Sequence, residues 1–132
     1  MFGNAGGARA MLKIAVKRIY EDVSPDDGFR VLIDRIWPRG MSKEHAALDL
    51  WLKEIAPTTE LRQWFHHQES SLENWQIFCG RYREELQHNP EPVKLLLQHC
   101  SEGVVTLLYS AKDTDHNQAI VLRDYLAEQQ AS

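Results

Sequence analysis

Residues 104–109 read VVTLLY and are followed by the polar run SAKDTDHN at 110–117. The first stretch is short, rich in β-branched residues and apolar apart from one threonine, and this composition predicts a buried strand. The second stretch has the side chains of a loop, and the pattern at 116–130 predicts a helix after it, with Asp115 as its N-cap. A buried strand that runs through a polar loop into a helix is typical of an α/β domain.

Two further strands are predicted near the start of the chain. Residues 12–19 (LKIAVKRI) alternate apolar and polar side chains, which indicates a half-buried strand. Residues 29–33 (FRVLI) are almost continuously apolar, which indicates a central strand, and Pro38 and Gly40 prevent its continuation. Because the connection to 104–109 is helical, we expect that strand to lie parallel to 29–33.

Helices are predicted across the middle of the chain from the spacing of apolar residues and from capping residues. The segments are a short helix capped by Ser42, then 48–55, 58–67, a long helix from Ser70 or Ser71 to 87, then 92–100, and 116–130. Strands near both ends with helices between them predict an α/β fold. We expect a small mixed or largely parallel sheet covered by helices, in a single compact domain.

This domain is expected to span residues 11–130. Residues 1–10 (MFGNAGGARA) are small and Gly-rich, so we expect a disordered N-terminal extension or a remnant of cloning, with Met11 as an equally good first residue. The segment has neither the basic nor the apolar region of a secretory signal. No stretch approaches the roughly 18–20 apolar residues of a membrane span, so we expect no membrane partner.

Composition and charge exclude several classes of protein. The chain has 132 residues, 43% of them hydrophobic, which suits one hydrophobic core and leaves no room for two. Its 15 Lys and Arg against 19 Asp and Glu give a net charge of −4, which argues against a generally basic nucleic-acid binder. The charge is uneven, since residues 1–43 hold eight basic and five acidic side chains and residues 44–132 hold seven and fourteen. The early segment is therefore locally positive.

The two cysteines, Cys79 and Cys100, lie within predicted helices. They are too few for a disulfide framework, so we expect reduced thiols and a cytoplasmic location, although a single disulfide between them stays open. The six histidines form no HExxH pattern, and neither GxGxxG nor GxxxxGK[ST] occurs. We therefore expect no metal site and no cofactor.

Polar loops follow two of the predicted strands, at residues 34–40 and 110–117. In a parallel sheet, ligands bind beyond the carboxyl ends of the strands, so these loops face each other if the strands are neighbours. Their cations suit a phosphate or a carboxylate, and the helix that follows presents free N–H groups to an anion. The predicted ligand contacts are Arg35, Trp37, Arg39, Lys112 and Asn117.

The same loops hold three candidate catalytic groups, Asp34, Asp113 and His116. An imidazole titrates near neutral pH, and either carboxylate could orient it for proton transfer. A structural alternative also stays open. In it the charged side chains pair within the loops or cap a helix, and Trp37 packs its loop against the body of the domain.

Four runs carry a resemblance to a known family: KRIY at 17–20, DGFRVLIDRIWPRG at 27–40, APTTELR at 56–62 and LLYSAKDTDHN at 107–117. From about residue 13 to residue 126 the chain resembles the YeaO-like proteins, a branch of the bacterial domain-of-unknown-function family 488. The resemblance implies a compact α/β fold, an intracellular bacterial setting and a pocket at the two polar loops. Other branches carry a cysteine followed by His-Arg in the late loop. This sequence has His116 and Asn117 there, so the resemblance implies no thiol chemistry.

These observations together predict a cytosolic protein that binds a small anionic ligand, a phosphate, carboxylate or nucleotide, at the ends of two strands. Whether it is an enzyme stays open. The alternative is a non-catalytic regulatory or interaction module that binds a protein or a nucleic acid through the positive early segment. Salt dependence separates the two, because nucleic-acid affinity falls steeply with added salt. Self-association through exposed apolar side chains is a third possibility.

Overall fold

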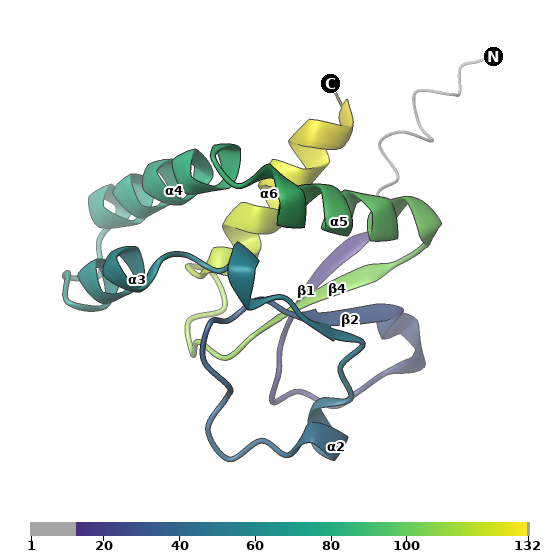
Figure 1. Cartoon of the computed structure of the whole chain (residues 1–132). Helices are drawn as coiled ribbons and strands as arrows, with labels where there is room; N and C mark the ends of the chain where they lie inside the picture. The colour runs from purple at the N-terminus through teal and green to yellow at the C-terminus, as the bar shows by residue number, and fades with distance from the viewer. Residues whose placement is uncertain (1–12, 132) are drawn as a thin grey trace.

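A four-stranded parallel sheet organises the protein, shown in Figure 1 as a computed structural model that describes residues 13–131. The strands are β1 (Ile14–Arg18), β2 (Phe29–Leu32), β3 (Leu50–Trp51) and β4 (Val105–Tyr109), in the order β1-β4-β2-β3. This sheet confirms the α/β prediction. The expected domain boundary at residue 11 and the extension at 1–10 lie outside the described residues.

Strand β4 lies between β1 and β2, and its five residues are all buried. It pairs with β2 in parallel, with Val31 opposite Leu107, which confirms the predicted relation of the two strands. Strand β1 pairs with β4 on the other side and is only partly buried, as the alternation at 12–19 predicts. The carboxyl ends of β2 and β4 therefore lie next to each other in the centre of the sheet.

The helices are α2 (Lys43–Ala46), α3 (Thr59–His66), α4 (Leu72–Gln87), α5 (Pro90–Glu102) and α6 (Gln118–Ala131), with short 3₁₀ turns η1 (Pro25–Asp27) and η2 (Lys53–Ile55). The capping residues Ser42, Thr58 and Ser71 accept hydrogen bonds from backbone N–H groups of α2, α3 and α4, which confirms the predicted starts of these helices. Helix α5 begins two residues earlier than predicted, with Pro90 in its first turn.

The helix predicted at 48–55 is wrong. The chain there forms β3 and η2 instead, because Asp49 exchanges hydrogen bonds with Arg30: the Asp49 N–H donates to the Arg30 carbonyl, and the Asp49 carboxylate accepts from the Arg30 N–H. Leu50 and Trp51 then pair with β2 as an edge strand. The apolar spacing of this segment fits a helix. Pairing with β2 satisfies the backbone N–H and C=O groups that a helix would have satisfied, so tertiary context overrides the helical preference.

Apolar side chains pack on both faces of the sheet. The larger cluster joins one face to helices α3 to α6 and includes Val31, Leu107, Tyr82 and Leu122. Figure 1 shows α4, α5 and α6 on one side of the sheet and the short α2 on the other. On that second face a smaller cluster of buried residues contains Ile19, Leu32, Ala46 and Leu108.

A buried ionic group ties the connection between β1 and β2 to the sheet. The Asp27 carboxylate accepts hydrogen bonds from Lys17 at 3.1 Å and from Arg30 at 2.5 Å, and also from the Ser24 N–H. Although burial alone raises the pKa of Asp27, the hydrogen bonds from Ser24, Lys17 and Arg30 bring that pKa below its ordinary value. Asp27 is therefore a charged structural link in the fold.

Both cysteines are free thiols, as predicted. Cys100 is buried, and burial raises its pKa to about 11, so the thiol is a poor nucleophile at neutral pH. Across residues 13–131, none of the helices has the length and apolar character needed to cross a membrane.

Candidate functional site

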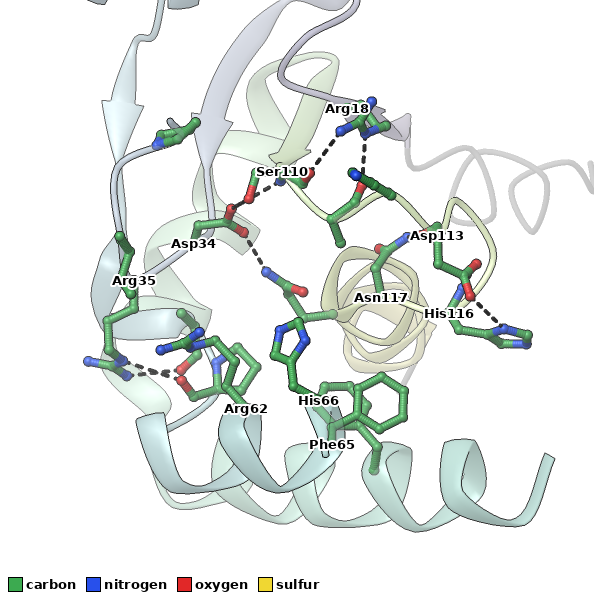
Figure 2. Close-up of a pocket in the computed structure, with 18 of the residues that line it drawn as sticks. Arg18, Asp34, Arg35, Arg62, Phe65, His66, Ser110, Asp113, His116 and Asn117 are labelled. Carbon is green, nitrogen blue, oxygen red and sulfur yellow. Dashed lines mark hydrogen bonds and ion pairs between the residues drawn. The ribbon is translucent and has the colours of Figure 1, made fainter. Parts of the chain in front are cut away.

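An open-sided cavity of about 1020 Å³ lies at the carboxyl ends of β2 and β4. Its walls come from the loops at 34–40 and 110–117, from α3, from the start of α4 and from residues at the ends of β1 and η2. The structure brings all eight residues singled out in the sequence into this lining: Asp34, Arg35, Trp37, Arg39, Lys112, Asp113, His116 and Asn117. Figure 2 shows the arrangement.

Asp34 is buried at the centre of this arrangement, with 8% of its surface exposed. One carboxylate oxygen accepts from the Ser110 N–H at 3.0 Å and from the Ser110 hydroxyl at 2.6 Å, and the other accepts from the Gln118 amide at 2.5 Å. Burial raises the pKa of Asp34, and these hydrogen bonds together with the positive charge of Arg62 offset part of the rise. The carboxylate already has three donors within the protein.

Arg35 anchors its loop to the segment that precedes α3. Its guanidinium donates to the carbonyl of Ala56 at 3.1 Å and to the carbonyl of Pro57 at 3.3 Å. Figure 2 shows these contacts on the opposite side of Arg35 from Asp34. Arg35 is therefore engaged with backbone, as the structural alternative for this loop proposes.

The side chain of Trp37 makes contacts within the protein, whereas that of Arg39 is exposed. The indole N–H of Trp37 donates to the Met41 carbonyl at 2.7 Å, and its ring meets Trp51 edge-on with centroids 5.2 Å apart, so Trp37 packs the loop. Arg39 holds the loop through its backbone carbonyl, which accepts from the Tyr20 hydroxyl at 2.8 Å. The side chain of Arg39 is exposed.

Asp113 organises the loop after β4. Its carboxylate accepts from the N–H groups of Asp115 and His116, at 2.9 and 3.0 Å, and lies 3.2 Å from Nδ1 of His116. The backbone hydrogen bond from Asp115, with those from His116, lowers the pKa of Asp113. The predicted pairing of His116 with a neighbouring carboxylate is present, and Asp113 supplies that carboxylate.

The predicted N-cap at Asp115 is wrong, because Asn117 caps α6. The Asn117 side-chain oxygen accepts from the N–H groups of Ala119 and Ile120, and its amide donates to the Asp113 carbonyl. Asn117 is buried in this role. Because these contacts satisfy N–H groups predicted to be free for an anion, the positive character of the cavity comes mainly from side chains.

Two cations at the cavity were not singled out from the sequence. Arg18 donates to the carbonyls of Ala111 at 2.8 Å and of Ser110 at 3.0 Å, which holds the loop after β4. Arg62 extends from α3, and its Nε is shielded from solvent with no hydrogen-bond partner within residues 13–131. A buried donor without an acceptor costs about 1–3 kcal/mol. Both arginines lie within the runs KRIY and APTTELR, but only tertiary structure places them at the cavity.

The cavity has an excess of positive charge. Five cations line it, against three carboxylates: Arg18, Arg35, Arg39, Arg62 and Lys112 against Asp34, Glu69 and Asp113. Over the described part of the chain, no hydrogen bond or ion pair engages the side chains of Arg39 and Lys112. The lining is therefore positively charged, although the chain as a whole has a net charge of −4.

An aromatic wall, formed by Phe65, Trp75 and Phe78, lies beside these charges. The Phe65 and Phe78 rings stack with centroids 4.5 Å apart, and the Trp75 and Phe78 rings stack at 5.7 Å. The His116 ring lies 4.9 Å from that of Trp75. Phe78 is buried and the other two rings are half-buried, so the wall is the edge of the hydrophobic core where that edge meets the cavity.

Metal-binding side chains do not gather at this site. Within residues 13–131, no three His, Cys, Asp or Glu residues are grouped so that they could hold a metal ion. The chemistry available at the cavity is therefore that of guanidinium and ammonium groups, one His–Asp pair and aromatic rings.

Comparison with known proteins gives one family. The family model described as "Inactive DUF488-N3 subclade" matches residues 13–132. The chain is 43% identical over 115 residues to the uncharacterized protein YeaO of Escherichia coli K12, which covers 87% of this chain and 97% of that protein. It is 40% identical over 114 residues to the uncharacterized protein Rv3073c of Mycobacterium tuberculosis H37Rv, which covers 86% and 93%. No solved structure matches the chain.

Proposed function

This chain belongs to the YeaO-like DUF488 family, in the subclade described as inactive, and on that premise we propose that it binds a small anionic ligand in the cavity without transforming it. The ligand is a phosphate, a carboxylate or a nucleotide. The observation that carries the proposal is the excess of cations around the cavity, five against three carboxylates. Guanidinium and ammonium groups are the usual partners of phosphate and carboxylate oxygens.

Arg39 and Lys112 are the proposed first contacts, because both are exposed and unpaired among the described residues. Arg35 and Asn117 support the site by holding its loops, and Trp37 packs one loop in place. In this proposal these three residues shape the cavity and do not themselves hold the ligand.

The proposal favours binding over catalysis for two reasons. The subclade description reads "inactive". In addition, Asp34 is buried and its carboxylate already accepts three hydrogen bonds from the protein, which leaves at most one acceptor site for a substrate proton. Asp113 and His116 are candidate polar contacts for the ligand, with the carboxylate orienting the imidazole. The protein should therefore bind anions without changing them.

An NMR titration with pyrophosphate and with citrate tests the proposal. We expect shifts of backbone amide signals at 34–40 and 110–117 in the ¹⁵N-labelled protein. Lys112→Ala and Arg39→Ala should each weaken binding about two- to fivefold, as for exposed charges. Lys94→Ala is the matched control, since Lys94 is exposed on α5 and outside the cavity lining. Absence of shifts with both anions would overturn the proposal.

The alternative function, a module that binds a protein or a nucleic acid, gives a different salt dependence. A single-stranded or duplex oligonucleotide would lose affinity steeply between low and physiological salt, with a slope set by the number of phosphates contacted. A ligand held by two or three cations would show a shallow slope. The same titration at two salt concentrations therefore separates the two functions.

We also propose a bacterial cytoplasmic setting. The support is the pair of free cysteines and the bacterial source of the similar proteins. Immunoblotting of cytoplasmic and periplasmic fractions from a bacterial host would test this location.

A further inference from the structure

The cavity is much larger than an inorganic anion. Sites for small molecules and cofactors occupy roughly 300–1,000 Å³, and the cavity of about 1020 Å³ is at the top of that range. A phosphate or carboxylate group held by the cations would fill only a corner of it. The rest of a ligand would have to contact the remaining lining, and part of that lining is aromatic.

Helix α3 presents a cation and a ring to the same side of the cavity. Arg62, Phe65 and His66 are spaced at i, i+3 and i+4, so they share one face of the helix, and all three line the cavity. Figure 2 shows the three side chains extending from this helix toward the interior of the site. Three residues rise about 4.5 Å along a helix axis. Arg62 and Phe65 therefore enter the cavity from neighbouring turns of one helix.

Among the lining cations in the described part of the chain, Arg62 is the one with a buried nitrogen that lacks a hydrogen-bond acceptor. Its Nε has no hydrogen-bond partner in residues 13–131 although it is shielded from water. Asp34 attracts it electrostatically, but among residues 13–131 the Asp34 carboxylate accepts hydrogen bonds from Ser110 and Gln118 and none from Arg62. A phosphate or carboxylate can engage Nε and a terminal nitrogen of one guanidinium together. A ligand in the cavity would supply the acceptor for Nε if the Arg62 side chain turned to bring that nitrogen to the cavity surface.

Phe65 and Trp75 bring aromatic rings to the same cavity as this cation. Both are half-buried and both line the cavity, while the buried Phe78 supports them from the core side. Stacking on an aromatic side chain tolerates any flat ring, because every such ring has a π face. The wall therefore selects for flatness more than for a particular hydrogen-bonding pattern.

From these observations we infer that the ligand carries a flat aromatic or heteroaromatic ring close to its anionic group, as a nucleotide does, with Arg62 binding the anion and the Phe65–Trp75 wall binding the ring. This inference rests on the proposed function and specifies the ligand class for the same cavity.

Calorimetric titration of the unmodified protein with three probes tests the inference: inorganic phosphate, cyclohexyl phosphate and phenyl phosphate. The last two have similar size, and only phenyl phosphate has a flat aromatic ring. We expect phenyl phosphate to bind about 5- to 150-fold more tightly than inorganic phosphate, as for stacking on one ring. Cyclohexyl phosphate should fall between the two. Adenosine monophosphate, as a fourth probe, should also bind more tightly than inorganic phosphate.

Two pairs of variants assign the parts of the site. Trp75→Leu should reduce the advantage of phenyl phosphate over inorganic phosphate, whereas Trp64→Leu, outside the cavity lining, should leave that advantage intact. Arg62→Gln should weaken all phosphate probes by a similar factor. Arg81→Gln is its control, because Arg81 lies over the Trp64 ring and away from the cavity. Thermal unfolding of each variant shows that it is folded.

The outcomes separate the inference from the proposed function. Equal affinity for phenyl phosphate and inorganic phosphate would overturn the inference and leave anion binding standing. A failure of all the phosphate probes and of pyrophosphate and citrate to bind would overturn both. Equal effects of Trp75→Leu and Trp64→Leu would overturn the assignment of the ring to the Phe65–Trp75 wall. The comparison of probes on the unmodified protein does not depend on any variant folding.

Discussion

Ser110 donates two hydrogen bonds to Asp34, one from its backbone N–H at 3.0 Å and one from its hydroxyl at 2.6 Å. Asp34 follows β2 and Ser110 follows β4, so the contact joins the carboxyl ends of the two central strands. It also fixes the spacing of the two loops that line the cavity. The first prediction concerns this contact.

Ser110→Ala removes the hydroxyl donor and leaves the backbone N–H in place. We expect the pKa of Asp34 to rise further, because the Ser110 hydroxyl is one of the groups that lower it. We also expect a loss of about 1.5–3 kcal/mol of unfolding free energy, typical of a hydrogen bond to a charged group. Carboxyl ¹³C NMR titration and urea unfolding measure these changes. Ser101→Ala, on exposed α5 backbone, is the control and should cost little. An unchanged Asp34 pKa would contradict the prediction.

Arg35→Ala and Arg39→Ala compare an anchored arginine with an exposed one in the same loop. Arg35 donates to the carbonyls of Ala56 and Pro57, so its loss should cost about 1–3 kcal/mol of stability. The Arg39 guanidinium makes no such contact among residues 13–131, and its loss should change stability by less than about 0.5 kcal/mol. Chemical unfolding of both variants measures the difference. Similar stabilities would show that Arg35 does not anchor the loop.

Asp27→Asn tests the buried ionic group through its pH dependence. Because the pKa of Asp27 is lowered by folding, its stabilisation is present above the ordinary value of 3.8 and is lost as the pH falls through the lowered pKa. The variant should lose about 3–5 kcal/mol at pH 7, where Lys17 and Arg30 keep their charges without the partner. Its stability should also depend less on pH between 2 and 5.

The control for this measurement is Asp26→Asn, an exposed carboxylate in the same 3₁₀ turn. It should behave like the unmodified protein in urea unfolding across the same pH range. If Asp27→Asn retained the full acid sensitivity of the unmodified protein, another carboxylate would have to account for it.

Gly28→Ala and Gly80→Ala should change stability in opposite directions. Gly28 has φ +62°, and an added Cβ would lie 2.4 Å from the Val104 carbonyl oxygen, so strain alone should cost about 1–3 kcal/mol. Gly80 lies within α4 with open space where an added Cβ would lie, and alanine there should add about 0.5–1 kcal/mol. Thermal unfolding measures both. A neutral Gly28→Ala would mean that β2 can shift away from Val104.

The strands and most helices could be predicted because their signals are local. The VVTLLY run is apolar enough to be buried whatever surrounds it, and Ser42, Thr58 and Ser71 mark helix starts by chemistry that acts over three residues. The segment at 48–55 could not be predicted in the same way. Its apolar spacing suits a helix, and only the neighbouring β2 backbone makes an edge strand the better solution.

The candidate site, like the fold, could be predicted from the sequence only in part. Parallel pairing of β2 and β4 follows from their helical connection, and it brings the loops at 34–40 and 110–117 together as predicted. The partners within those loops could not be predicted. Arg35 contacts Ala56 and Pro57, and Asn117 rather than Asp115 caps α6, because loop side chains bind whichever backbone groups the fold leaves unsatisfied nearby.

Local sequence patterns were enough to predict the α/β architecture and the two loops at the carboxyl ends of the central strands, because apolar periodicity and capping act within a few residues. Which cations of those loops are engaged with backbone, and which are exposed, depends on the packing of the whole fold. That packing also brings Arg18, Arg62 and the Phe65–Trp75 wall to the same cavity. These residues come from three separate elements, and their proximity depends on how α3 and α4 pack against the sheet, a relation that no local pattern encodes.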